Sequence, residues 1–537
     1  MADTDTEVLV IGGGAVGLAV ALELGWRGRR CIVLDEGNGT IEHPRTGGIS
    51  LRTMEHCRRW GIADEVRNNQ FNPDFKLDTV FCTSLTGFEL GRAEGPSMRD
   101  TPIPRESPER KVRCPQFWFD PMLSKAARSY DAVRVEYFTH VDGFEQRPDG
   151  TSMVSAHDVR NGEQRQFSGR YLIGCDGPAS DVREALGIQM SGIPLLNYSV
   201  NVLFRAPGMI SKSNFSEAER FIFVGPAGTW GNITVVDGRG MWRLTVIGSE
   251  ERLDLASFDP ASYLELAFGG PGLDFEVLSV SPWRRTQLVA DSYQKGSVYL
   301  SGDAIHTMSP TGGFGVNTGI GDAVDLAWKL DAVLAGWAGP GLLDSYEAER
   351  RPIGLRNAAA ATRNFRGWSP KADLSLILDE TDAGVAARAE IGAALLAGTH
   401  EEWESIGVIL GYRYENSPIC VPDGTPPTPD EFSEYIQTAR PGSRAPHAYL
   451  PDGSSTLDLF GRGFTLVHSA KADRGAVVRI LSAARPGTPA HATEVPDEVC
   501  ELYAAAFTLV RPDGHVAWRG NDIPAEPASV WDVVTGS

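Results

Sequence analysis

The stretch EVLVIGGGAVGLAVALELGW, Glu7 to Trp26, decides the fold of this chain. Its first five residues form a short β-branched run of the kind that makes a buried parallel strand. Three glycines follow with the spacing G-x-G-x-x-G: Gly12, Gly14 and Gly17. At this spacing one glycine makes a tight turn, one admits a pyrophosphate close to the backbone, and one lets the next helix pack on the strand.

A second strand and two carboxylates complete the context. Ala15 and Val16 open the helix, whose amino end would face the phosphates of a dinucleotide. The apolar run from 31 to 34 ends at Asp35 and Glu36, about twenty residues past the glycines, where a carboxylate would meet a ribose hydroxyl. Glycine-rich turns also occur for packing alone, so a plain βαβ unit is the alternative, but the full context favours a dinucleotide site.

Length, charge and cysteine usage narrow the class of protein. The 537 residues are too many for one compact core. The formal net charge of -20 would repel a polyanion, so we expect no nucleic acid partner. Neither a bilayer-length apolar run nor a signal peptide is recognised, which predicts a cytoplasmic protein without membrane contact. The 7 cysteines form no C-x-x-C pair, so neither a metal centre nor a redox dithiol is expected.

Two later strand ends belong to the same pattern. The runs 171–173 and 298–300 read as buried strands that deliver Asp176 and Asp303 to their carboxyl ends. Ligands of open α/β sheets bind outside these ends. After Asp303, a glycine-rich loop from Pro310 leads into a helix that begins near 315–317. The bare amino end of that helix, with about half a positive charge, would stabilise an anion.

The region between these two strand ends alternates apolar and polar residues, as an antiparallel sheet with one covered face does. We expect it to form a second domain that supplies a wall for a substrate. Its aromatic content suits an aromatic substrate, but core packing explains it equally well. The residues concerned are Phe204, Phe221, Phe223, Trp230 and Trp242.

The predicted fold class is therefore α/β, a Rossmann-like domain with an inserted antiparallel-sheet substrate domain and a further α/β domain at the carboxyl end. The expected segments are 1–75, 112–190 and 286–365 for the nucleotide domain, 76–111 and 191–285 for the substrate domain, 366–430 for a helical connection and linker, and 435–537 for the last domain.

Three motifs together carry a family resemblance: GGGAVG with Asp35, CDG at 175–177, and LSGDAIH at 300–306 followed by PTGGFGVNTGIGDA. The combination resembles the FAD-dependent aromatic hydroxylases, which are single-component flavoprotein monooxygenases, over roughly residues 7–363. The segments RTMEHCRRWG and RCPQFWFDPML are most similar to the 2,4-dichlorophenol 6-monooxygenase and phenol hydroxylase branch. The last domain resembles the thioredoxin-like domain of many such enzymes, which lacks the dithiol, as here.

The resemblance implies that FAD is the cofactor and assigns it residues. Those implied for the adenosine half and its glycine turn are Gly12, Gly14, Ala15, Val16, Gly17, Asp35, Glu36 and, through backbone, Val141. Those implied for the phosphate and ribityl region are Arg45, Gln116 and Asp303. Those implied at the pyrimidine end of the flavin are Gly313, Gly315, Val316 and Asn317. Asp176 is similar to the acidic residue of a motif that serves both FAD and NAD(P)H.

The implied reaction is hydroxylation of a phenol-like ring. NAD(P)H would reduce FAD, and oxygen would add to give a flavin hydroperoxide that transfers hydroxyl to the ring, in simple chlorophenol catabolism or in tailoring of an aromatic natural product. The helix after Gly315 predicts that reduced flavin is anionic. A base near the ring oxygen should help, but the residues 47–50 offer neither carboxylate nor imidazole. His306 is a catalytic candidate with packing as its alternative, and Pro310 would shape the face that reacts with oxygen.

Three other interpretations compete with this one. Flavin-dependent halogenases carry a W-x-W-x-I-P signature, and no two tryptophans here are two residues apart. An FAD-containing protein that sequesters an aromatic compound, or an uncoupled NAD(P)H oxidase, stays open. The aromatic substrate is the expected partner, and self-association into a homo-oligomer is left open.

Overall fold

The computed structural model describes residues 5–41 and 47–537. Strand β1 (Thr6–Ile11) lies inside a sheet whose order is β16-β17-β10-β1-β2-β7. The other strands of this path are β2 (Cys31–Leu34), β7 (Val133–Glu136), β10 (Gln164–Gly174), β16 (Gln294–Lys295) and β17 (Val298–Leu300). All pairs from β7 to β17 are parallel, so their carboxyl ends share one edge. The three predicted strand ends thus lie side by side.

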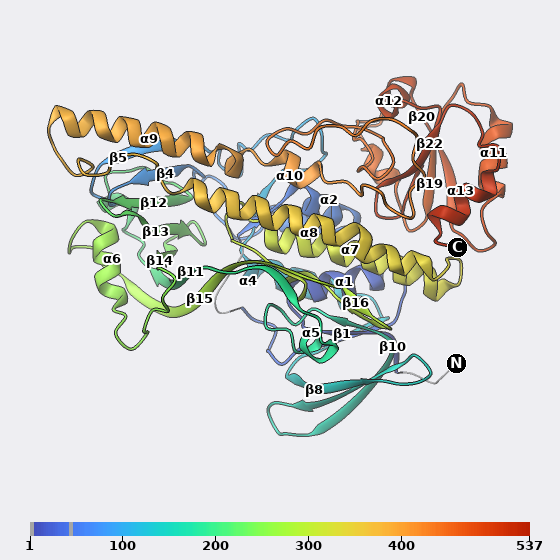
Figure 1. Cartoon of the computed structure of the whole chain (residues 1–537), viewed down its shortest axis with the longest axis horizontal. Coiled ribbons are helices and arrows are strands. Elements are labelled where there is room, and N and C mark those ends of the chain that lie inside the picture. The colour runs from blue at the N-terminus through green and yellow to red at the C-terminus, as the bar shows by residue number, and fades with distance from the viewer. Residues whose placement is uncertain (1–4, 42–46) are drawn as a thin grey trace.

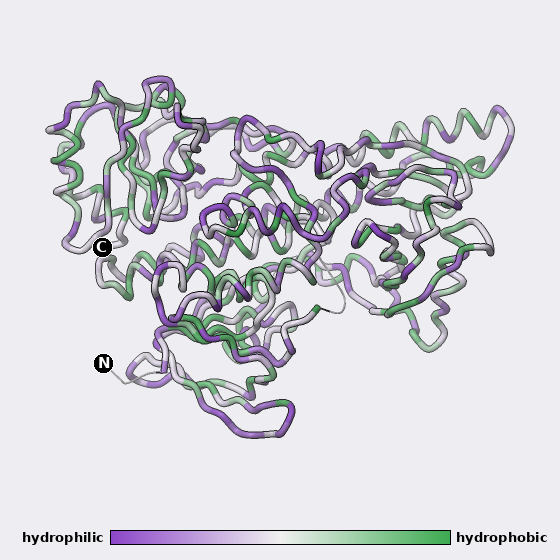
Figure 2. Tube along the Cα trace, turned by 180° about the vertical axis from the view of Figure 1, so that it is seen from behind, coloured by the Kyte–Doolittle hydropathy of each residue, from purple (hydrophilic) through white to green (hydrophobic). Residues whose placement is uncertain are grey.

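Helices cover this sheet and bury their apolar sides on it. Helix α1 (Ala15–Trp26) packs against α4 (Gln116–Ala127) and α7 (Phe314–Ala335), and is buried on nearly every side. Figure 2 shows the hydrophobic colouring gathered along these central elements, whereas the outlying hairpin of β8 (Thr139–Gln146) and β9 (Ser152–Asp158) is mostly hydrophilic. The short helix α5 (Asp181–Leu186) follows β10.

A second sheet has the order β18-β15-β11-β14-β13-β12-β4-β5. Its strands are β4 (Thr79–Cys82), β5 (Glu89–Ala93), β11 (Met190–Arg205), β12 (Arg220–Gly225), β13 (Gly228–Val235), β14 (Met241–Ile247), β15 (Glu276–Ala290) and β18 (His306–Thr307). The expectation of a purely antiparallel sheet is wrong, because β4 pairs with β12 in parallel. A tight turn would force antiparallel pairing, but β4 comes from a distant segment and is free of that constraint.

Three further helices run along the molecule. In Figure 1, α8 (Gly341–Gly367) lies beside α7, and α9 (Asp382–Trp403) continues toward the second sheet, with α10 (Ile406–Leu410) after it. Shorter elements fill the space around the first sheet and the end of the second: α2 (Leu51–Arg59), α3 (Ala63–Arg67), α6 (Pro260–Phe268), β3 (Gly48–Ile49) and β6 (Val112–Arg113). Within the described ranges, no helix is long and apolar enough to cross a membrane.

The carboxyl-terminal region forms a separate four-stranded sheet of order β20-β19-β21-β22 (red in Figure 1). Its elements are β19 (Phe464–Ser469), α11 (Arg474–Ser482), β20 (Ala490–Val495), α12 (Asp497–Tyr503), β21 (Phe507–Val510), β22 (Val516–Gly520) and α13 (Pro527–Val534). Phe464 and Trp531 share a hydrophobic cluster with Trp328 of α7 and Leu342 of α8. This domain therefore docks through an apolar contact as well as through polar ones.

Candidate active site

The three glycines of the first turn have three different surroundings. A Cβ on Gly12, whose φ is +102°, would lie 2.4 Å from the carbonyl oxygen of Cys175. A Cβ on Gly17 would lie 1.9 Å from the carbonyl oxygen of Gly12, whereas one on Gly14 would meet nothing within 4 Å. Gly14 also begins α1 without a side-chain cap. The open space and uncapped N–H groups fit a pyrophosphate approaching the backbone.

The carboxylate of Asp35 stabilises this loop. Its Oδ2 accepts a hydrogen bond from the Gly13 N–H at 2.6 Å, and its Oδ1 accepts one from the Gly37 N–H at 2.8 Å. The next residue, Glu36, is exposed and lies 2.8 Å from Nδ1 of His140. Asp35 is thus held in place by two backbone N–H groups, while Glu36 faces the surface.

A continuous cavity of about 1240 Å³ joins the nucleotide edge to the second sheet. Most of the predicted site residues line it, although they come from three distant segments. They are Gly14, Ala15, Val16, Gln116, Asp303, Pro310, Gly313, Gly315, Val316 and Asn317.

The start of α7 lies open to this cavity. Gly313 caps the helix at φ 69° and offers no side-chain acceptor, so the first N–H groups stay available. The side chain of Asn317 is used within the protein: its Oδ1 accepts from the Ser50 N–H at 2.9 Å and from Thr53 Oγ1 at 2.7 Å. Asn317 therefore anchors the loop before α2 to the helix end.

Other predicted residues lie away from the cavity lining. Asp176 Oδ2 accepts from the Val182 N–H at 3.1 Å at the start of α5, while its buried Oδ1 has no hydrogen-bond partner among the residues that the structure describes. Burial raises the pKa of this carboxyl group. Val141 lies in β8 and pairs with Ala156 of β9. Arg45 lies outside the described residues.

His306 does not reach the cavity. It is 0% exposed, and its Nε2 lies 2.7 Å from Oδ2 of Asp322. Nε of Arg350 donates to the other oxygen of the same carboxylate at 2.7 Å. These contacts favour the packing interpretation of His306 over the catalytic one.

No motif or spacing in the sequence identifies several of the residues that line the cavity. They are Arg220, Arg243 and Arg285 from the second sheet and Trp368, Glu402, Trp403 and Tyr412 from the segment expected to be a connection. Alternation along a strand shows that two faces differ, but it does not show which face meets a ligand. The aromatic residues singled out in the sequence mostly belong to the core instead: Phe204, Phe221, Phe223 and Trp242 are at most 2% exposed.

Glu402 links this wall to the glycine loop. Its Oε1 lies 2.8 Å from Nη1 of Arg220 and accepts from the Gly312 N–H at 3.3 Å, while its Oε2 accepts from Trp368 Nε1 at 2.6 Å. Both oxygens of this carboxylate are thus engaged by donors of the protein, and the group that would deprotonate a substrate stays unassigned.

The fold and the cavity together are those of a dinucleotide-binding protein with room for a second ligand beside the cofactor. Comparison with known families matches residues 5–361 to an FAD binding domain and residues 438–535 to the carboxyl-terminal domain of aromatic-ring hydroxylases. The chain belongs to the FAD-dependent aromatic hydroxylases, which are monooxygenases that use NAD(P)H and oxygen.

Individual relatives span several substrates. A structure described as chromopyrrolic acid-soaked RebC with bound 7-carboxy-K252c superimposes with a TM-score of 0.92 at 38% identity, covering 100% of both chains. A putative polyketide hydroxylase of Streptomyces halstedii is 35% identical over 97% of this chain and 94% of its own length. The 2,4-dichlorophenol 6-monooxygenase of Cupriavidus pinatubonensis is 30% identical over 98% and 94%. The comparisons show the family and do not single out the dichlorophenol branch.

Proposed function

We propose that this enzyme hydroxylates a phenol-like ring of a polar aromatic natural product. Bound FAD supplies the chemistry that activates oxygen, with NAD(P)H as the source of electrons. The protein's part is to hold the cofactor at the glycine turn and the α7 start, to place the ring beside Pro310, and to enclose the reacting groups away from water.

The single observation that carries this proposal is the continuity of the cavity. One space of about 1240 Å³ is lined by Gly14 of the glycine turn, Gly313 at the start of α7 and Asn232 of the sheet wall. A ligand on the sheet wall would therefore share a space with a dinucleotide bound at the edge of the first sheet. The uncapped start of α7 supports an anionic reduced flavin, because its N–H groups would face the pyrimidine end.

The choice between tailoring and simple phenol catabolism rests on the wall itself. A small chlorophenol offers one hydroxyl to hydrogen-bonding partners, whereas this wall presents Asn201, Asn232, Thr234 and Thr245. The RebC structure, a protein of the same fold, holds a carboxylated ligand, 7-carboxy-K252c. These points favour the more polar substrate of a tailoring reaction.

The test uses purified enzyme reconstituted with FAD. A panel of phenols and polycyclic aromatic acids is screened for stimulated NAD(P)H oxidation and oxygen uptake, with product mass as the final readout. We expect a product heavier by one oxygen atom. Stimulated uptake that yields only peroxide would support the uncoupled oxidase, and ligand binding without stimulation would support a sequestering protein.

Three further expectations are proposals of the same kind. The segment boundaries given above would separate the domains, and the four-stranded terminal sheet would be thioredoxin-like and structural.

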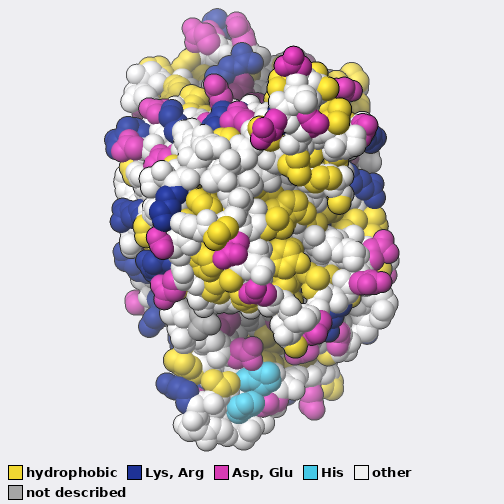
Figure 3. All heavy atoms as spheres, turned by 90° about the vertical axis from the view of Figure 1, so that its left-hand side faces the viewer, with side chains coloured by type: hydrophobic (Ala, Val, Ile, Leu, Met, Phe, Trp, Pro, Cys, Tyr) yellow, Lys and Arg dark blue, Asp and Glu magenta, His cyan; other side chains and the backbone are white. Residues whose placement is uncertain are grey.

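The third expectation is that the protein associates with itself. Figure 3 shows hydrophobic side chains gathered on the end of the molecule formed by the second sheet, α6 and α9, elements that expose Leu266, Leu278 and Val385. Such a surface is where a homo-oligomer would bury area.

A further inference from the structure

Helix α2 contacts both the cavity and the carboxyl-terminal domain. Ser50, its N-cap, and Arg52, in its first turn, line the cavity. Residues three and four positions apart share one face of a helix. On α2 three such residues, Arg52, Glu55 and Arg59, each bind a group of the terminal domain. A single rigid element therefore joins the expected cofactor site to a domain that does not line the cavity itself.

The contact between α2 and the terminal domain is a buried group of charges. Both oxygens of Glu55 accept from Arg444, with Nε at 3.0 Å from Oε2. Arg52 donates through Nη1 to the same Oε2 at 2.8 Å and through Nη2 to the carbonyl oxygen of Asp513 at 2.7 Å. The side chains of Arg444 and Glu55 are 1% and 3% exposed. Burial alone would raise the pKa of Glu55, but Arg444 and Arg52 lower it, so the carboxylate is ionised.

The opposite side of α2 is tied to the start of α7. Asn317 Oδ1 accepts from the Ser50 N–H at 2.9 Å and from Thr53 Oγ1 at 2.7 Å, and its Nδ2 donates to the carbonyl oxygen of Gly48 at 3.2 Å. Thr53 and Glu55 are two residues apart, about 3 Å along the helix axis. A displacement of α2 at Glu55 would therefore reach Asn317 and the loop 47–50 that borders the cavity.

Stability alone is a weak reason for such a group of charges. An apolar set of the same shape often stabilises a buried contact as well as an Arg–Glu–Arg set does, because the charges must be desolvated. The forked contact of a guanidinium with a carboxylate instead fixes one relative orientation. At this interface it fixes the position of α2 against the terminal domain.

We propose that the terminal domain positions the flavin end of the cofactor site through α2, with Glu55 and Arg444 as positioning residues. This inference rests on the part of the proposed function that places FAD beside the start of α7. It does not depend on which compound is hydroxylated.

The first test is the affinity of the apoprotein for FAD, measured by flavin fluorescence. Arg444→Lys keeps the charge but loses the forked contact, and we expect it to weaken FAD binding by about fivefold, because the loosened α2 no longer fixes Asn317. Unchanged FAD affinity in Arg444→Lys would overturn the proposal.

Arg58 offers a matched control on the same helix. It binds Asp458 of the terminal domain at 2.6 Å, but the two side chains are 34% and 32% exposed. Because exposed pairs hold little energy, Arg58→Met should leave FAD affinity within about twofold. An equal weakening in Arg58→Met and Arg444→Lys would point to general docking of the domain and would contradict a positioning role for the buried pair.

Hydrogen exchange of the apoprotein reads the same effect without any cofactor. The Ser50 N–H is held by Asn317, so peptides covering 47–53 should exchange about fivefold faster in Arg444→Lys. Peptides of β19, in the centre of the terminal sheet, should exchange as in the unmodified protein. Unaltered exchange at 47–53 would sink the proposal even if FAD affinity changed.

A double-variant cycle tests whether the two ends of α2 act together. Thr53→Val removes the hydroxyl that contacts Asn317 and leaves the contacts with the terminal domain in place. We expect it to weaken FAD binding by about threefold, and the combined Thr53→Val and Arg444→Lys protein to lose less than the product of the single losses. Losses that multiply would show two independent effects and overturn the link through α2.

These measurements need neither a substrate nor turnover, which separates the inference from the proposed function. Coupled losses of FAD affinity in an enzyme that gives no hydroxylated product would leave the positioning role standing and sink the hydroxylation. Efficient hydroxylation together with unchanged FAD affinity in every variant would do the reverse.

Discussion

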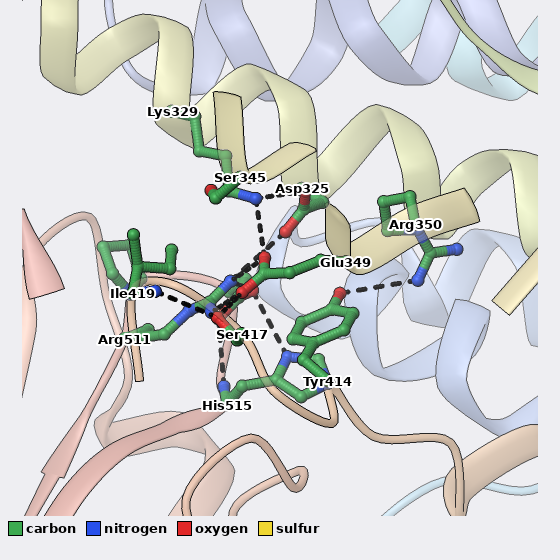
Figure 4. A network of polar contacts seen from close by, with 12 residues as sticks. Asp325, Lys329, Ser345, Glu349, Arg350, Tyr414, Ser417, Ile419, Arg511 and His515 are labelled. Carbon is green, nitrogen blue, oxygen red and sulfur yellow. Dashed lines mark hydrogen bonds and ion pairs between the residues drawn. The ribbon is translucent and has the colours of Figure 1, made fainter. Parts of the chain in front are cut away.

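Two buried groups of charged side chains in this protein differ in what faces them. Between α7, α8 and the carboxyl-terminal domain, Lys329 Nζ lies 2.6 Å from Glu349 Oε2, and Arg511 Nη1 lies 2.6 Å from Glu349 Oε1 (Figure 4). Asp325 and Asp513 complete the set. On the cavity wall, by contrast, Arg285 has no carboxylate within ion-pair distance in the part of the chain that the structure describes.

The difference is that the interface network pairs its charges within the protein. In the interface network every cation contacts carboxylates. Burial alone would raise the pKa of Glu349, but Arg511 and Lys329 lower it to about 2. Burial raises the pKa of Asp325, and the neighbouring Lys329 opposes that rise. The network is complete without a ligand, whereas Arg285 on the cavity wall has no carboxylate beside it among the described residues.

Arg511→Met gives the largest expected effect, because it removes the cation that joins both sides of the interface. Glu349 and Asp513 would stay buried without their main partner. Breaking a buried pair on one side typically costs about 3–5 kcal/mol. Equilibrium unfolding in urea, followed by tryptophan fluorescence, should show this loss in the free energy of unfolding.

An exposed pair in the same domain is the control for that change. Arg479 and Asp473 are 3.4 Å apart, with side chains 63% and 66% exposed. Because surface pairs contribute below about 1 kcal/mol, Arg479→Met should be nearly neutral. Similar losses in the two variants would show that the buried network is not what holds the terminal domain.

The sequence predicts those features of the site that follow from short runs of residues. Apolar runs that end in glycine or aspartate placed Gly14, Asp303 and Gly313 at one sheet edge, because parallel strands bring their ends together. The sequence could not show which face of β14 lines the cavity, since alternation distinguishes two faces but the neighbouring elements decide what each face contacts. Nor could it pair Arg511 with Glu349, which are 162 residues apart and obey no spacing rule.

The buried His515, in the same domain as Arg511, should make the stability of the protein depend on pH. The centroid of its ring lies 4.3 Å from that of Tyr414, with the two ring planes tilted by 36°, and burial lowers the pKa of His515 to about 4, although Asp513 opposes the change. An unfolded histidine titrates near 6.5. Stability from His515 is therefore fully present above pH 6.5 and is lost as pH falls toward 4, by up to about 1.4 kcal/mol per pH unit.

Unfolding measured across that window should accordingly be less pH-dependent in His515→Gln than in the unmodified protein. The exposed His491 supplies the control, and His491→Gln should leave the slope unchanged. The slope is compared rather than the absolute stability, because the substitution also alters ring packing. An unaltered slope in His515→Gln would mean that this ring takes up its proton as readily in the folded state as in the unfolded chain, and the interface would then carry one more cation at the acidic end of that window.

Two glycines of the first turn differ in the same way: one faces protein atoms and the other faces open space. Substitution of the second should have the smallest effect of the changes considered. Gly12→Ala forces a Cβ to 2.4 Å from the Cys175 oxygen at a φ of +102°, so the fold itself should lose stability. Gly14→Ala meets no protein atom within 4 Å. It should leave the unfolding temperature of the apoprotein unchanged and weaken FAD binding by about tenfold, or about 1.4 kcal/mol, because the methyl group would occupy space that the pyrophosphate needs. Titration of apoprotein with FAD, followed by flavin fluorescence, measures this. Normal FAD affinity in Gly14→Ala would show that the open side of α1 is not where the phosphates lie, and the reading of the cavity as one space shared by cofactor and substrate would fail with it.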